Sequence, residues 1–256
     1  MTVLNQIGSL NPWLVAAVLN IALGLIGWRL VSKLLTPAGL VHAWILGVVV
    51  WGVLGWPGYL VVLFYFLAGS AVTKVGMAEK EAAGIAEKRS GARGPENVWG
   101  SAASSTLCAL ATLVVPIPYR PLLYLGYVSG FSTKLSDTTA SEIGKAYGNR
   151  TFLITTLRPV PRGTEGAVSL EGTIAGLVAS VVIAGLAWAV GLISLMGVIW
   201  CIIAAFVATN LESVIGATVQ SQFNWLTNEV VNGINTLIGA LVAMGLALVW
   251  SHFVGL

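Results

Sequence analysis

Residues 38–72 read Ala38-Gly-Leu-Val-His-Ala-Trp-Ile-Leu-Gly-Val-Val-Val-Trp-Gly-Val-Leu-Gly-Trp56-Pro57-Gly58-Tyr-Leu-Val-Val-Leu-Phe-Tyr-Phe-Leu-Ala-Gly-Ser-Ala-Val72. The stretch contains no Asp, Glu, Lys or Arg, and each side of Pro57 approaches the roughly 20 apolar residues that a membrane-spanning helix needs. Proline interrupts a helix because it lacks a backbone N–H and its ring clashes with the preceding turn. The break at Trp56-Pro57-Gly58 therefore predicts two spanning helices that form a tight hairpin.

The composition of the whole chain agrees with this local pattern. Of 256 residues, 57% are hydrophobic and only 9% are charged, whereas soluble domains carry about 25% charged residues. The in/out alternation of a β-barrel is absent. We expect an all-α, polytopic integral membrane bundle that forms a single membrane domain over residues 1–256. About eight spans are predicted (seven to nine are compatible): Pro12–Trp28, Ala38–Trp56, Gly58–Val72, Val98–Val115, Pro121–Phe131 (continuing polar to Ser136), Thr173–Val190, Leu192–Ala208 and Ile234–Phe253.

The charged residues are concentrated in two polar stretches, residues 73–97 and 134–171. With eight spans and an outside N-terminus, every Lys and Arg except Arg120 falls on one face. Because cytoplasmic loops carry the excess of Lys and Arg, both stretches are predicted to face the cytoplasm. We attribute the net charge of +3 to the membrane topology and to phosphate binding. Basic residues interleaved with aromatic ones are missing, so no nucleic-acid partner is expected.

Several catalytic classes are excluded by what the chain lacks. GxxxxGK[ST] is absent, which excludes a P-loop protein. The histidines, His42 and His252, lie near the ends of predicted helices and form no HExxH or His/Cys cluster, so zinc chemistry is not expected. Cys108 and Cys201 fall inside apolar spans, which argues against a disulfide framework.

The residues that remain suit phosphates and a hard divalent cation. Asp137 and Glu142 are about 140° apart on a helix, so they should flank a cleft, and they are the predicted catalytic residues and ligands of Mg²⁺. Arg158 and Arg162 offer forked donors for phosphate oxygens and complete the catalytic set. The further candidates for nucleotide or phosphate binding are Lys74, Lys80, Arg93, Asn97, Ser136, Thr138, Ser141, Gly163, Thr164 and Glu165. Additional candidates are Glu171 as a metal ligand, and Glu212, Asn228 and Asn232 on the same face.

Structural roles compete with some of these assignments. The charges around Glu87 suit a solvated loop equally well, and Asn228 and Asn232 suit hydrogen bonding between helices. Small-residue pairs such as Gly172/Gly176 and Gly239/Ala243 would serve packing within the chain or a homodimer, and packing is the better interpretation. An ionised side chain inside a membrane helix, however, costs about 2.5–3.5 kcal/mol on insertion scales. Asp137 and Glu142 therefore remain functional candidates.

The chain offers no obvious general base beyond its carboxylates. A kinase that acts on an alcohol positions a base for the hydroxyl proton, but an acceptor that is already a phosphate needs none because its oxygen is ionised at neutral pH. Catalysis then consists of holding two polyanions together and neutralising their repulsion.

Two motifs point to a known family. Lys134-Leu-Ser-Asp-Thr-Thr-Ala-Ser-Glu-Ile-Gly-Lys-Ala-Tyr-Gly148 and Val160-Pro-Arg-Gly-Thr-Glu-Gly-Ala-Val-Ser-Leu-Glu-Gly-Thr173 resemble the phytyl-phosphate kinases of cyanobacteria and plastids, relatives of the eukaryotic transmembrane protein nineteen family. Thr73-Lys-Val-Gly76 and Arg93-Gly-Pro-Glu-Asn97 share the likeness. The Asp137-x-x-Ala140-x-x-x-Gly144-x-x-x-Gly148 spacing is also similar to CTP-dependent polyprenol kinases and CDP-lipid synthases.

The resemblance implies a Mg²⁺-dependent transfer of a nucleotide γ-phosphate to phytyl monophosphate. The donor would be CTP, UTP or ATP, and the product, phytyl diphosphate, would serve tocopherol and phylloquinone synthesis. The location implied is a cyanobacterial inner or thylakoid membrane, where membrane lipid surrounds the protein. Two alternatives remain open: a CTP-dependent transferase of the CDP-lipid synthase or polyprenol kinase type, and a lipid-phosphate transporter.

Overall fold

The computed structural model describes residues 11–254, and nearly all of its regular elements are helices. The helices are α2 (Pro12–Ile26), α3 (Trp28–Leu34), α4 (Pro37–Lys74), α5 (Met77–Ala82), α6 (Pro95–Ala111), α7 (Arg120–Tyr147), α8 (Leu170–Ala189), α9 (Leu195–Thr218) and α10 (Asn228–Val254), with single 3₁₀ turns η1 (Lys88–Gly91), η2 (Ile117–Tyr119) and η3 (Gln220–Gln222). The all-α prediction is confirmed except for one short antiparallel ladder, in which β1 (Thr151–Leu153) pairs with β2 (Ala167–Ser169).

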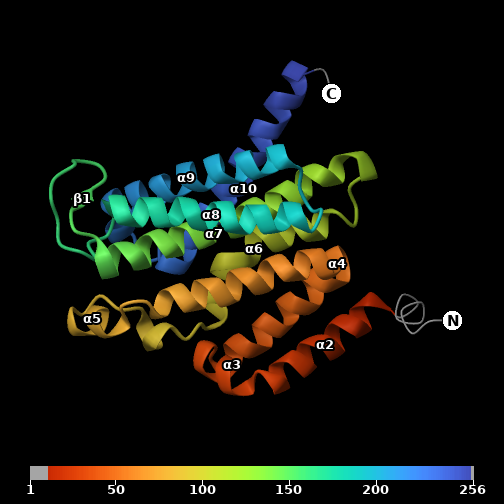
Figure 1. Ribbon diagram of the computed structural model, residues 1–256, viewed down its shortest axis with the longest axis horizontal. Coiled ribbons are helices and arrows are strands. Elements are labelled where there is room, and N and C mark those ends of the chain that lie inside the picture. The colour runs from red at the N-terminus through yellow and green to blue at the C-terminus, as the bar shows by residue number, and fades with distance from the viewer. Residues whose placement is uncertain (1–10, 255–256) are drawn as a thin grey trace.

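The predicted hairpin lies inside α4. Gly55 has a positive φ of 66°, two residues before Pro57, and it separates two helical halves. A residue with a side chain rarely adopts this φ, whereas glycine does so at little cost. Figure 1 shows that the chain reverses its direction at this point, so the two halves run back along each other. The hairpin predicted from the Trp56-Pro57-Gly58 break is therefore confirmed.

The predicted number of spans is not confirmed. Each predicted segment lies largely on a helix, but within residues 11–254 only α4, α8, α9 and α10 contain a stretch long and apolar enough to cross a membrane. α4 counts once in this group, although its chain reverses at Gly55. The pair α2–α3, bent by 92°, would add a fifth span. α6 is short at 17 residues, and the second half of α7 is polar. Neither helix is therefore among the candidate membrane spans.

Helix α7 is the centre of the bundle. It packs against α4, α6, α8, α9 and α10, and its side chains are buried almost continuously from Leu125 to Asp137. Polar side chains join it to its neighbours: Tyr127 Oη donates to the Gly58 carbonyl (2.7 Å), and Ser129 Oγ donates to the Gly239 carbonyl (2.8 Å). Such bonds between helices hold α7 in register where water is excluded.

Small residues let α8 and α10 approach α7 closely. A Cβ on Gly172 would lie 2.5 Å from the Ala140 carbonyl oxygen, and one on Gly239 would lie 2.0 Å from Thr133 Oγ1. Gly176 likewise faces Ser136. The small-residue faces were predicted to serve either packing within the chain or a homodimer, with packing preferred. The structure shows that they pack against other helices of the same chain.

This packing predicts that Gly172→Ala destabilises the protein and Gly185→Ala does not. The Gly172 Cβ would press on backbone, which cannot move aside cheaply, so we expect a loss of about 1–3 kcal/mol. Gly185 lies on the same helix and has nothing within 4 Å of an added Cβ, which makes it the matched control. Thermal unfolding of the detergent-solubilised variants measures the difference. Equal melting temperatures would contradict the close contact between α7 and α8.

Candidate functional site

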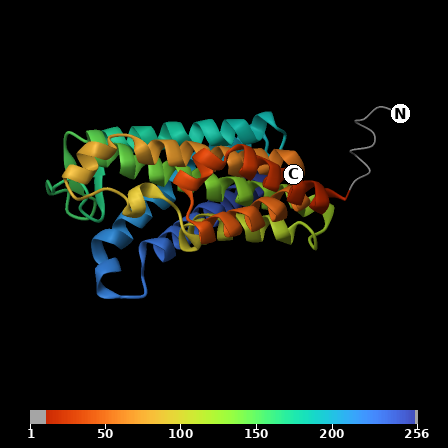
Figure 2. The same cartoon turned by 90° about the horizontal axis from the view of Figure 1, so that it is seen from below.

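The two predicted polar stretches lie at one end of the bundle. Figures 1 and 2 show α5, the β1–β2 hairpin and the turn between α9 and α10 together at that end. Between them lies a cavity of about 860 Å³, lined by the second half of α7, the loop after α5, the hairpin loop, and the facing ends of α8, α9 and α10. The structure therefore brings the two polar stretches together at one end of the bundle.

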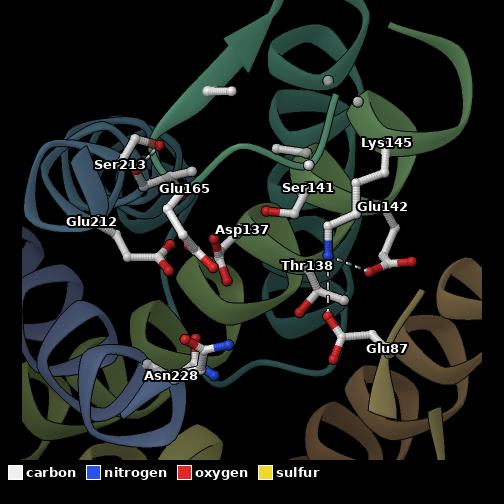
Figure 3. Close-up of a pocket in the computed structure, with 18 of the residues that line it drawn as sticks. Glu87, Asp137, Thr138, Ser141, Glu142, Lys145, Glu165, Glu212, Ser213 and Asn228 are labelled. Carbon is white, nitrogen blue, oxygen red and sulfur yellow. Dashed lines mark hydrogen bonds and ion pairs between the residues drawn. The ribbon is translucent and has the colours of Figure 1, made fainter. Parts of the chain in front are cut away.

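Asp137 belongs to a buried polar cluster inside this cavity. Lys134, one helical turn earlier, donates from Nζ to Asp137 Oδ2 at 2.6 Å and to Asn232 Oδ1 of α10 at 2.7 Å. Glu212 of α9 places its carboxyl group beside that of Asp137 (Figure 3). Asn235 of α10 donates to Glu212 Oε2 at 3.3 Å. Three helices thus supply an interlocked set of acid, base and amide groups.

Glu165 approaches the same cluster from the hairpin loop (Figure 3). The loop passes so close to α9 that a Cβ on Gly166 would lie 2.5 Å from the Ser213 carbonyl oxygen, and Gly166 has a φ of 75°. Only glycine satisfies both conditions. The short ladder between β1 and β2 fixes the two ends of the loop, so Glu165 is held toward Asp137 and Glu212.

Glu142 belongs to a second, separate cluster. It forms a salt bridge with Lys80 of α5, and both side chains are almost wholly buried. Lys80 Nζ also donates to the Thr73 carbonyl at 2.9 Å. Lys145 lies 3.6 Å from Glu142 and 3.3 Å from Glu87 of the loop after α5, as Figure 3 shows. This cluster ties the first polar stretch to α7.

The two predicted acids therefore flank one cavity, as expected from their helical spacing, but they lie in separate clusters. Each is held by its own lysine and points toward different neighbours (Figure 3). Among the residues that the structure describes, no three His, Cys, Asp or Glu side chains converge as metal ligands. The geometry places Asp137 beside Glu212 and pairs Glu142 with Lys80.

The first polar stretch contributes Arg93 and Asn97 to the cavity wall. Arg93 lies over the rings of Tyr65 and Phe66, with its guanidinium carbon 5.3 and 5.8 Å from their centroids. Asn97 donates to Glu229 Oε1 of α10 at 3.3 Å. By contrast, Lys74 donates to the Ser90 carbonyl at 2.5 Å and, like Lys80, lies outside the lining.

Three further predicted residues lie outside the cavity. Arg158 is exposed on the hairpin loop. Arg162 turns back and donates to the Ala146 carbonyl at 3.0 Å, which caps the last turn of α7. Glu171 accepts hydrogen bonds from the backbone and side chain of Asn149 at 3.2 and 3.0 Å. The geometry gives no support to the catalytic roles predicted for the two arginines or to Glu171 as a metal ligand.

The remaining predicted residues line the cavity: Ser136, Thr138, Ser141, Gly163, Thr164, Glu165, Glu212, Asn228 and Asn232. Sequence reasoning missed Lys134 and Lys145, which the structure places beside the two acids. It gave a solvated loop equal weight for Arg89, which lines the cavity. The spacing of Lys134 and Asp137, i and i+3 on one helix, was the available signal for the first of these pairs. Arg89 pairs with Glu96 at 2.5 Å, and this ion pair lowers the pKa of the Glu96 carboxyl.

Comparison with known proteins places the chain in a family. The family described as integral membrane protein DUF92 matches residues 20–240. The chain belongs to this family. The chain is 65% identical over 235 residues to the uncharacterized membrane protein sll0875 of Synechocystis sp., and the match covers 92% of this chain and 91% of that protein. The predicted membrane family with cyanobacterial members is therefore confirmed.

More distant relatives extend the comparison to plastids and archaea. The chloroplast protein VTE6 of Arabidopsis thaliana is 45% identical over 243 residues, covering 93% of this chain and 73% of its own. The membrane protein MJ0933 of Methanocaldococcus jannaschii is 28% identical over 221 residues, covering 83% of this chain and 86% of its own. No solved structure matches the chain. This DUF92 protein is thus an integral membrane protein with a plastid relative.

Proposed function

We propose that this DUF92 protein is a membrane-embedded isoprenyl-phosphate kinase that transfers the γ-phosphate of a nucleoside triphosphate to phytyl monophosphate. The observation that carries the proposal is the cavity at the polar end of a membrane bundle, where Asp137, Glu212 and Lys134 meet. The 45% identity to the chloroplast protein VTE6 supports a role that is shared with plastids. The product, phytyl diphosphate, would serve tocopherol and phylloquinone synthesis.

The donor set fits Mg²⁺. Carboxylate and amide oxygens are hard ligands, and Mg²⁺ is usually bound by one or two carboxylates plus substrate phosphates. Asp137 and Glu212 supply two adjacent carboxylates, Glu165 approaches them, and Asn228 and Asn232 border the same space. Two neighbouring acids in a low-dielectric site repel each other, and a cation between them and the phosphates relieves that repulsion. When bound, Mg²⁺ would neutralise charge on the transferred phosphoryl group.

The protein's own residues then bind, orient and shield the substrates. Lys134 holds Asp137 in place and brings positive charge to the cavity, and Arg93, Lys145 and Arg89 add charge from other sides of its wall. No residue needs to accept a proton, because a phosphate acceptor is already ionised. Ile85 packs against Gly163, so the two polar loops meet over the cavity and limit the entry of water.

We place the cavity on the cytoplasmic side of a cyanobacterial inner or thylakoid membrane. Every Lys and Arg except Arg120 falls on the corresponding face in the predicted topology, and this is where nucleotides are available. A protease-accessibility experiment on sealed membrane vesicles of known orientation tests the assignment. Cleavage in the loop after α5 from the cytoplasmic side only is the expected result, and cleavage from the opposite side only would contradict it.

A panel of nucleotides and acceptors tests the activity. The purified protein in lipid nanodiscs is given phytyl monophosphate, Mg²⁺ and either CTP, UTP or ATP, and the products are identified by mass spectrometry. We expect phytyl diphosphate and a nucleoside diphosphate, with no product after EDTA treatment and full recovery when Mg²⁺ is restored. A nucleotide-linked lipid with pyrophosphate would instead identify a CDP-lipid type transferase. Movement of lipid phosphate across the bilayer without nucleotide consumption would identify a transporter.

A further inference from the structure

The cavity does not stop at the polar end of the bundle but continues between α8 and α9. Its lining includes residues that recur at helical spacing on each of these two helices. The lining residues are Gly172, Thr173, Gly176 and Leu177 on α8 and Phe206, Thr209, Asn210, Ser213 and Gly216 on α9. One face of each helix therefore borders the same continuous space.

This extension reaches into the apolar part of the molecule. At a rise of 1.5 Å per residue, Leu177 lies about 10 Å along α8 from its first residue, and Phe206 lies about 15 Å from Gly216 along α9. Both helices are long and apolar enough to span a membrane. Figure 2 shows the polar end of α9 directed away from α8. The cavity thus runs from the carboxylates to membrane depth.

The lining changes from polar to apolar along this path. Thr209 marks the change, since its Oγ1 is buried and has no hydrogen-bond partner among residues 11–254. Beyond it lie Leu177 and Phe206, and the Phe206 side chain is 45% exposed. Next to Leu177 on α8, Ile174 and Val178 are 52% and 56% exposed, as expected for side chains that face lipid. The deep end of the space therefore borders the lipid-facing surface.

We propose that the groove between α8 and α9 is the lateral entrance and binding site for the isoprenyl chain of the acceptor. The inference rests on the proposed function for the nature of the headgroup. A phosphate at Asp137 and Glu212 would leave its hydrocarbon chain pointing along the apolar wall of Leu177 and Phe206. An amphiphile already dissolved in the bilayer reaches the site through this side opening, so its chain never crosses water.

The groove predicts that substitutions at its wall affect long acceptors and spare short ones. Leu177→Trp fills the groove, so the KM for phytyl monophosphate should rise about tenfold or more, as expected when a pocket rejects part of its ligand. The KM for isopentenyl monophosphate, whose chain ends before the obstruction, should change less than about twofold under the same principle. Val178→Trp is the matched control because Val178 is the next residue on α8 and faces away from the cavity. It should change neither KM.

A second measurement is independent of turnover. An isoprenyl monophosphate that carries a diazirine on its terminal chain segment is photoactivated on the wild-type protein in nanodiscs, and the labelled peptides are mapped. Labels on α8 and α9 near Leu177 and Phe206 are expected, even if the protein transfers no phosphate, in which case only the proposed function fails. Labels confined to other helices would overturn the inference. So would equal effects of Leu177→Trp on the long and the short acceptor.

Discussion

Asp137→Asn should lower phosphoryl transfer by about a thousandfold, the loss expected when one preorganised electrostatic group is removed from a closed site. Asp137 lies between Lys134 and Glu212 inside the cavity, and the amide keeps the shape of the side chain and its hydrogen bond from Lys134. The substitution removes the negative charge that would hold a cation and that also pairs with Lys134. Initial rates with phytyl monophosphate at saturating Mg²⁺ measure the effect.

Two comparisons separate this effect from unfolding. Glu79→Gln removes a carboxylate from the exposed surface of α5, outside the cavity, and should leave the rate unchanged. The melting temperature of Asp137→Asn should fall less than that of Lys80→Met, because Asn232 still accepts a hydrogen bond from Lys134 and the Glu212 carboxylate remains close to it. A variant that is folded and retains more than about a tenth of the rate would contradict the electrostatic role given to Asp137.

Lys80→Met should destabilise the protein by about 3–5 kcal/mol, because it leaves the buried Glu142 carboxylate without its closest partner. Lys80 and Glu142 are almost fully buried, so water does not compensate for the lost ion. For a chain of this size, such a loss corresponds to a fall in melting temperature on the order of 10 °C. Thermal unfolding in detergent, followed by intrinsic tryptophan fluorescence, measures it.

The double variant Lys80→Met/Glu142→Gln shows whether the cost comes from the unpaired charge. Its melting temperature should be higher than that of Lys80→Met alone, because no buried charge is then left unpaired. The same cycle tests the sequence-based prediction that Glu142 is a metal ligand. If Glu142→Gln abolished the Mg²⁺ response while the protein stayed as stable as the wild type, the structural role argued for this salt bridge would be wrong.

Local patterns were sufficient to predict the helices and the position of the polar loops. The hairpin followed from Pro57 and its glycine neighbours because a proline ring and a positive φ act on the chain locally. Asp137 was predicted for the site because a charge in an apolar helix is costly unless it has a use. The count of membrane spans was less predictable, since α6 and α7 carry polar residues, some of which are bonded to neighbouring helices.

The partners of the acids could not be predicted, because they come from distant parts of the chain. Glu142 is paired with Lys80, which is 62 residues away, and Asp137 lies beside Glu212 of α9. Spacing along α7 alone suggested that the two acids serve one ion, whereas tertiary contacts divide them. The orientation of Arg158 and Arg162 could not be predicted either. It depends on the path of the hairpin loop, which is set by the positive φ of Gly163 and Gly166 and by the contact of Gly166 with α9.

The transfer of label from a nucleotide to the lipid tests the central claim most directly. Purified wild-type and Asp137→Asn proteins are given a γ-labelled nucleoside triphosphate, Mg²⁺ and phytyl monophosphate, and the lipid fraction is separated. We expect label in phytyl diphosphate with the wild type and almost none with the variant. If the wild type left the lipid unlabelled with every nucleotide, or if the variant labelled it equally well, a phosphotransferase site built around Asp137 would be contradicted.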